Sequence, residues 1–143
     1  SDALSEKFLS RWRALAADIG LEEVKSEEIG GYLLTNIAGL TDITTVQDTS
    51  LQCWMASTIE SQVEHPVAAE LAIFFHDVIY DARRSDNEEQ SAIQLKEKLH
   101  GIVGGSIVVS ATFTIEATKR HQPTRSPDTN RVLDLDMMIL GQD

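Results

Sequence analysis

Residues 66–80, PVAAELAIFFHDVIY, decide how the chain folds. The stretch opens with a proline, which is well placed in the first turn of a helix. Five apolar residues, 71–75, then follow without a break. A helix that is apolar on nearly all sides belongs in a protein interior. The stretch therefore predicts a buried helix, and it places His76 and Asp77 late in that helix.

An ionisable pair in such surroundings is unfavourable unless its charges are paired, hydrogen-bonded or bound to a metal. An imidazole nitrogen beside a carboxylate oxygen suits a divalent transition metal. The alternative is a satisfied core histidine with a neighbouring aspartate on the helix surface. The dipeptide alone leaves both interpretations open.

Composition restricts the class of partner. The 143 residues fit one domain, residues 1–143, and the net charge of −11 comes from 12 basic and 23 acidic residues. This balance disfavours nucleic-acid duplexes and anionic membranes, whereas a small phosphorylated substrate is compatible where a metal or local cations offset the field.

Cys53 is the only cysteine, which excludes an internal disulfide. No apolar run approaches the ~20 residues of a membrane span, so we expect a cytoplasmic protein.

The apolar spacing and the helix-end signals predict an all-α fold, a compact single-domain bundle of six or seven helices. Residues 107–119 are rich in β-branched side chains, but no partner strands are evident, so a helix is expected there too. Residues 41–49, 81–86 and 122–130 are expected to be loops. Ser85 with Glu88 is a candidate capping box, and Ser126 is a candidate N-cap. The expected helices span residues 5–19, 26–40, 51–63, 66–80, 85–99, 107–119 and 128–140, and Gly20, Gly101 and Gly141 are expected to end the first, fifth and last of them.

The last of these helices contains two aspartates with different environments. At ~100° per residue, Asp136 falls among the apolar residues of the helix, whereas Asp134 lies on the far side. A carboxylate in a core-facing stripe is either a buried hydrogen-bond hub or a metal ligand. Asp134 is expected to be a surface residue.

Four ordered motifs carry a resemblance to a known family. The pattern is similar to the HD superfamily, and within it to the predicted metal-dependent HD-type phosphohydrolases. It spans most of the chain from residue 11 onward. The motifs are RWRAL (11–15), FFHDVIYDARRSDNEEQSA (74–92), ATKRH (117–121) and LDLDMMILG (133–141).

The resemblance implies an HD-type helical bundle and a divalent metal site. By position, His76, Asp77 and Asp136 match metal ligands of the family. Either Glu88, which matches the NE motif, or Asp81 would orient the attacking water. The phosphate of a nucleotide or another small phosphoester would contact a basic set, Lys119, Arg120, His121 and Arg83. For His121 with Lys119 the resemblance leaves a second role open, that of facing a second metal.

One departure from the family pattern bears on activity. The family's first ligand is a histidine on an earlier helix, and here Tyr32 and Asn36 stand where histidines are expected. Asparagine is a poor ligand for a transition metal, so the resemblance implies a site that is weakened, altered in metal preference or inactive. Relatives also continue beyond LGQD with further helices. The alternatives are a catalytically silent HD-like binding module and a buried polar network that serves stability alone.

Overall fold

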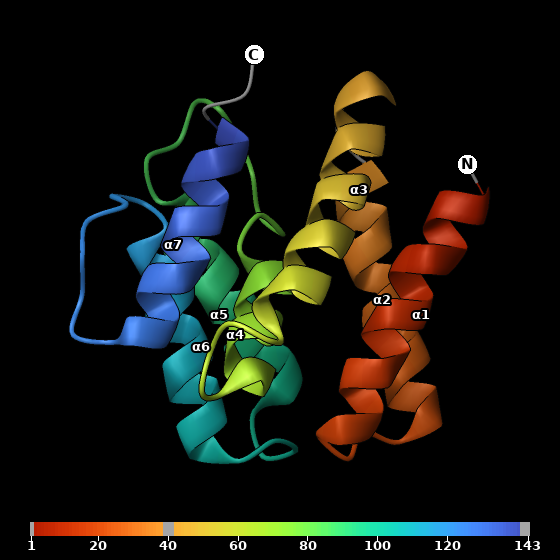
Figure 1. The fold of residues 1–143 in the computed structure, drawn as a ribbon. Helices are drawn as coiled ribbons and strands as arrows, with labels where there is room; N and C mark the ends of the chain where they lie inside the picture. The colour runs from red at the N-terminus through yellow and green to blue at the C-terminus, as the bar shows by residue number, and fades with distance from the viewer. Residues whose placement is uncertain (1, 39–41, 141–143) are drawn as a thin grey trace.

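The structure is a computed structural model that describes residues 2–38 and 42–140. Within these residues the chain is all-helical and has no strand, which confirms the predicted fold class (Figure 1). None of the helices in this part of the chain is both long and apolar enough to cross a lipid bilayer. The helices are α1 (Asp2–Asp18), α2 (Glu23–Ala38), α3 (Asp42–Ile59), α4 (Pro66–Phe75), α5 (Asn87–Leu99), α6 (Gly105–Ala117) and α7 (Pro127–Leu140).

The helix α4 lies at the centre of the bundle, with α1 and α3 on one side and α6 and α7 on the other (Figure 1). Residues 71–75 are at most 1 % exposed, as expected for a helix that is apolar all round. The helix ends at Phe75, five residues before the predicted end. The reason is local. Nδ1 of His76 donates a hydrogen bond to the carbonyl oxygen of Ile73, and in a continued helix that oxygen would accept from the N–H of Asp77.

Aromatic side chains fix α1 against α4. The rings of Phe8 and Trp12 meet that of Phe74 edge to face, with centroids 5.2 and 5.5 Å apart. The indole N–H of Trp12 donates to the carbonyl of Ser26 in α2 at 2.9 Å. The buried Trp12 thus packs α1 against α4 and bonds it to α2, and its indole N–H is not left without an acceptor.

Several predicted boundaries are confirmed, and two predictions besides the end of α4 are wrong. Gly20 and Gly101 end α1 and α5 in the left-handed conformation, with φ of 79° and 78°, whereas Gly141 lies outside the described residues. The Oγ of Ser126 accepts from the N–H of Thr129 at 3.1 Å, as an N-cap should. The expected loop at residues 41–49 is instead helical from Asp42 onward, and residue 41 lies outside the described part.

The second wrong prediction is the capping box of Ser85 and Glu88. The helix α5 starts later, at Asn87, and its N-cap residue is Asp86, whose side chain makes no capping hydrogen bond. The carboxylate of Asp86 is occupied by the guanidinium of Arg84, with both N–O distances 2.8 Å. Ser85 therefore precedes the cap, and the capping explanation for Glu88 is lost.

Two adjacent glycines in α2 make a test of the packing between α1 and α2. A Cβ at Gly30 would lie 2.9 Å from Cδ1 of Trp12, whereas one at Gly31 would meet nothing within 4 Å. We expect Gly30→Ala to destabilise the protein by about 1–3 kcal/mol through overpacking. Gly31→Ala should stabilise it by about 0.5–1 kcal/mol through helix propensity. Urea denaturation of both variants measures this, and stabilisation by both would show that α1 and α2 pack less closely than described.

Candidate functional site

The candidate site begins at His76, where α4 ends. Its side chain is buried, with 7 % of the residue exposed, and its Nδ1 lies 2.8 Å from the carbonyl oxygen of Ile73. A carbonyl only accepts hydrogen bonds, so Nδ1 carries a proton. The backbone contact therefore fixes the ring and leaves Nε2 as the nitrogen available to other groups.

Two carboxylates face that nitrogen. The Nε2 of His76 is 3.1 Å from Oδ2 of Asp77 and 3.6 Å from Oδ1 of Asp136. The other oxygen of Asp136 accepts from Nε2 of His121 at 2.6 Å. We call these four residues the histidine–aspartate cluster. It joins the end of α4, the loop after α6 and the middle of α7.

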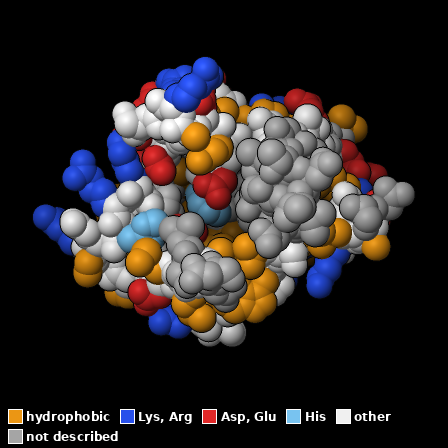
Figure 2. All heavy atoms as spheres, turned by 90° about the horizontal axis from the view of Figure 1, so that it is seen from above, with side chains coloured by type: hydrophobic (Ala, Val, Ile, Leu, Met, Phe, Trp, Pro, Cys, Tyr) orange, Lys and Arg blue, Asp and Glu red, His pale blue; other side chains and the backbone are white. Residues whose placement is uncertain are grey.

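The burial of Asp136 is as the helical pattern predicts. The residue is 8 % exposed and lies among buried apolar residues of α7, including Val132, Leu133 and Leu135. Asp134 is exposed and pairs with Arg131 at 3.4 Å, which confirms it as a surface residue. Figure 2 looks onto the end of the bundle where α7 ends, and there a histidine lies beside an acidic side chain in a hollow.

The charges in the cluster stabilise one another. Burial disfavours the cation of His76, but the carboxylates of Asp77 and Asp136 outweigh it and raise the pKa of His76 well above its usual value. Burial also disfavours the anion of Asp136, but His76 and His121 outweigh it and lower the pKa of Asp136. In this geometry the cluster holds a proton on Nε2 of His76, between two carboxylates.

His121 reaches Asp136 through an unusual backbone conformation. Its φ is 53°, and it is the one non-glycine residue with positive φ in the described part of the chain. Histidine adopts this left-handed region more readily than most residues, at a modest energetic cost. The following loop is tied to α7 by Asn130, whose Oδ1 accepts from the N–H of Thr124 at 2.8 Å. The contact of His121 with Asp136 was not predicted from the sequence, because a left-handed conformation at a residue other than glycine has no local signal.

The donor atoms of the cluster suit a divalent transition metal, which binds imidazole nitrogen and carboxylate oxygen. Two ligand atoms on one such ion lie about 3.0–3.4 Å apart, given metal–ligand distances near 2.1 Å. The distances of 3.1 and 3.6 Å from Nε2 of His76 are close to this range. The 2.6 Å contact between His121 and Asp136 is a direct hydrogen bond instead, and no group of three ligands among the described residues is arranged as a finished metal site. The donor atoms are therefore of the kinds that bind a divalent ion, whereas their present spacing is that of a hydrogen-bonded cluster.

Asp81 and Arg83 pair with each other instead of with the cluster. The guanidinium of Arg83 donates to both oxygens of Asp81 at 3.1 and 3.0 Å, and this bond lowers the pKa of Asp81. A carboxylate held in this way is a weak base. The pair lies at the surface, in the loop between α4 and α5.

Glu89, which sequence reasoning missed, makes the contact to the loop that carries His121. Its Oε2 accepts from Nζ of Lys119 at 3.0 Å, and this bond lowers its pKa. Its Oε1 is buried and has no hydrogen-bond partner. The neighbouring Glu88 is half-buried, and neither its side chain nor that of Arg120 forms an ion pair within the described residues. The second glutamate of NEEQ could have been considered beside the first. Its contact with Lys119 spans 30 residues, however, and no local pattern indicates it.

Tyr32 and Asn36, where the resemblance leads one to expect a histidine, make other contacts. The hydroxyl of Tyr32 donates to Oε1 of Gln94 in α5 at 3.0 Å. The side-chain amide of Asn36 donates to the carbonyl of Tyr32 at 2.7 Å, within its own helix. The structure therefore gives α2 no hydrogen bond or ion pair to the histidine–aspartate cluster in the part it describes.

No family model, curated protein or solved structure matches this chain. The resemblance to the HD superfamily therefore depends on the residue pattern alone.

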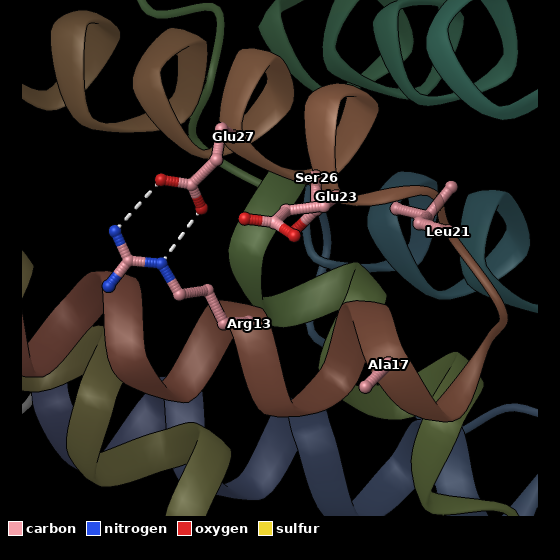
Figure 3. Close-up of a pocket in the computed structure, with 6 residues that line it drawn as sticks. All are labelled: Arg13, Ala17, Leu21, Glu23, Ser26 and Glu27. Atoms are coloured by element: carbon pink, nitrogen blue, oxygen red, sulfur yellow. Dashed lines mark hydrogen bonds and ion pairs between the residues drawn. The ribbon is translucent and has the colours of Figure 1, made fainter.

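A separate groove of about 480 Å³ lies between α1 and α2 (Figure 3). Arg13 and Glu27 face one another across it and form two hydrogen bonds of 2.8 and 2.9 Å. The pair is exposed, so salt and water screen it. None of the residues that line this groove belongs to the cluster, and we assign it no role in the chemistry of the cluster.

Proposed function

We propose that the histidine–aspartate cluster binds a divalent metal ion and that the protein hydrolyses small phosphoesters. The observation that carries the proposal is the convergence of His76, Asp77, His121 and Asp136, from three separate segments, at distances of 2.6 to 3.6 Å. Two carboxylates surround Nε2 of His76, so a positive charge is favourable at that position. In the described geometry a proton on Nε2 supplies this charge, and a bound divalent ion would supply it in place of the proton.

The chain's own residues have distinct tasks in this proposal. Ile73 holds Nδ1 of His76 and thereby sets the direction of Nε2, as backbone carbonyls do for ligating histidines. Asp136 offers one oxygen to each histidine. The chemistry supplied by a bound divalent ion would be polarisation of a phosphoryl oxygen and activation of water. Glu88, which has no ion pair of its own in the described part, is free to orient that water, whereas Asp81 would first have to leave Arg83.

Cationic side chains beside His121 would hold the phosphate. Lys119 and Arg120 immediately precede it in the chain. They offset the net charge of −11, which otherwise repels an anionic substrate. Because Lys119 is paired with Glu89, a bound phosphate would compete with that carboxylate for the ammonium group. Arg83 already donates to both oxygens of Asp81 and is therefore the weakest of the expected phosphate contacts.

The second candidate is a catalytically silent helical module. The position of Asn36 favours it, because its amide bonds to its own helix and leaves the family's first ligand unreplaced. In that case the cluster would remain as a polar network that joins α4 to α7. Metal binding without turnover, or no metal binding at all, would agree with this candidate.

Metal analysis tests the proposal directly. Protein purified without chelator and then incubated with Zn²⁺, Mn²⁺ or Fe²⁺ should retain about one equivalent after desalting. His76→Ala should abolish this, because it removes the nitrogen that both carboxylates face. The control is His65→Ala, since that histidine is exposed and lies outside the cluster. The metal-loaded protein should hydrolyse some members of a phosphoester panel of nucleoside monophosphates and p-nitrophenyl phosphate. Equal metal retention by the wild type and His76→Ala would overturn the proposed site.

A further inference from the structure

The outer face of α6 is unusually apolar for an exposed surface. Val109 is 66 % exposed and Phe113, one turn later, is 48 % exposed, while Ile102 before the helix is 45 % exposed. Figure 1 places α6 at the side of the bundle away from α1 and α2. We propose that this face binds the same face of a second copy of the chain, with the two α6 helices antiparallel. The proposal goes beyond the phosphohydrolase function and does not depend on it.

The charge distribution points to a second copy as the partner. Each chain carries a net charge of −11, so two copies repel one another over most of their surfaces. Residues 101–115, however, contain no charged side chain. Two copies can therefore approach along α6 without bringing acidic groups together. An anionic membrane is a poorer partner, because such surfaces are bound by apolar helices rich in Lys and Arg.

The shape of this face also suits a twofold arrangement. A groove of about 630 Å³ lies beside the start of α6 and is lined by Ile102, Gly105 and Val109 among others. A side chain at Gly105 would meet nothing within 4 Å, so the groove is open there. In an antiparallel pair whose axis passes between residues 109 and 113, Val109 of one copy faces Phe113 of the other. Each phenyl ring then enters the partner's groove, and the contact is the same in both directions.

Unpaired charges at the two ends of the face fix the direction. Lys96 lines the groove at the start of α6, and Glu116 lies near the end of the helix. Neither forms an ion pair with its own chain in the part that the structure describes. The antiparallel arrangement brings Lys96 of each copy to Glu116 of the other, whereas a parallel one brings like charges together. Arg120, one turn beyond Glu116, then faces the partner's Ile102.

The size of the face sets the expected affinity. A helix of 13 residues is about 20 Å long. Even with the flanking loops, this gives an interface at the small end of the range for specific complexes, where association is transient. We therefore expect a dimer that forms in the micromolar range and dissociates on dilution.

Sedimentation velocity from about 1 to about 200 µM, a range that brackets micromolar dissociation constants, tests the proposal. The wild type should shift from monomer to dimer, and Val109→Glu, at an exposed position, should stay monomeric with an unchanged far-ultraviolet spectrum. A monomer at all concentrations, or a dimer that survives Val109→Glu, would overturn the proposed face.

A charge exchange tests the antiparallel register. Lys96→Glu and Glu116→Lys should each weaken association roughly fivefold, as expected for an exposed ion pair used twice. The double variant should restore it to within about twofold of the wild type. Glu22→Lys, which makes the same charge change as Glu116→Lys but in the turn between α1 and α2, is the control and should not weaken association. Failure of the double variant to recover would overturn the antiparallel arrangement.

Discussion

Replacing Asp136 by alanine is expected to lower the free energy of unfolding by about 3–5 kcal/mol, because it breaks a buried charge pair. The carboxylate of Asp136 contacts both His76 and His121. Without it, the cation of His76 keeps only the half-exposed Asp77, and the ring of His121 loses its acceptor. Chemical denaturation with a chelator present measures the effect in the absence of metal.

Two further variants separate the charge from the packing. Asp136→Asn keeps the volume, but its amide offers a single oxygen, so it can serve only one histidine as an acceptor. We expect a loss of about 1–3 kcal/mol. Asp134→Ala, on the exposed side of the same helix, should change stability by no more than about 0.5 kcal/mol. If Asp136→Ala had as small an effect as Asp134→Ala, the cluster would not be closed in solution.

The parts of the fold that could be predicted are those set by local pattern. The burial of α4 followed from its uniform apolarity, and the burial of Asp136 followed from its position on the helical wheel. The end of α4 could not be predicted in this way, because it depends on the side chain of His76, which bonds to the backbone carbonyl of Ile73. The start of α3 was missed because polar and β-branched residues at 42–49 have only slightly unfavourable helix propensities.

The parts of the site that escaped prediction depend on contacts between distant segments. His121 contacts Asp136 only because its backbone is left-handed, a conformation that a sequence signals at glycine and seldom elsewhere. The contact of Glu89 with Lys119 depends on how α5 is rotated about its axis, which the sequence does not specify. The resemblance pointed to the neighbouring Glu88 instead. The roles of all these residues in binding a metal or a phosphate stay predictions.

The stability of the metal-free protein should fall as the pH rises above neutrality. The pKa of His76 is raised well above its usual value in the folded state, whereas it is near 6.5 in an unfolded chain. The stabilisation from its cation is therefore fully present below about pH 6.5 and is lost as the pH rises through the folded pKa, with a slope of up to about 1.4 kcal/mol per pH unit. The pKa of Asp136 is lowered, so its contribution is present above about pH 4 and is lost as the pH falls through its folded pKa.

A bound divalent ion should reverse the alkaline slope. It requires an unprotonated Nε2 on His76, so its affinity rises as that proton is lost. Ligand binding to the folded state adds to stability by mass action. We therefore expect that thermal unfolding with a chelator shows declining stability from pH 7 to 9, and that excess Zn²⁺ or Mn²⁺ removes or inverts the decline. His65→Ala should follow the wild type under both conditions, since that side chain is exposed, whereas His76→Gln should lose both the decline and the response to metal. A decline that no divalent ion alters would instead identify the cluster as a polar network that stabilises the bundle, with no part in catalysis.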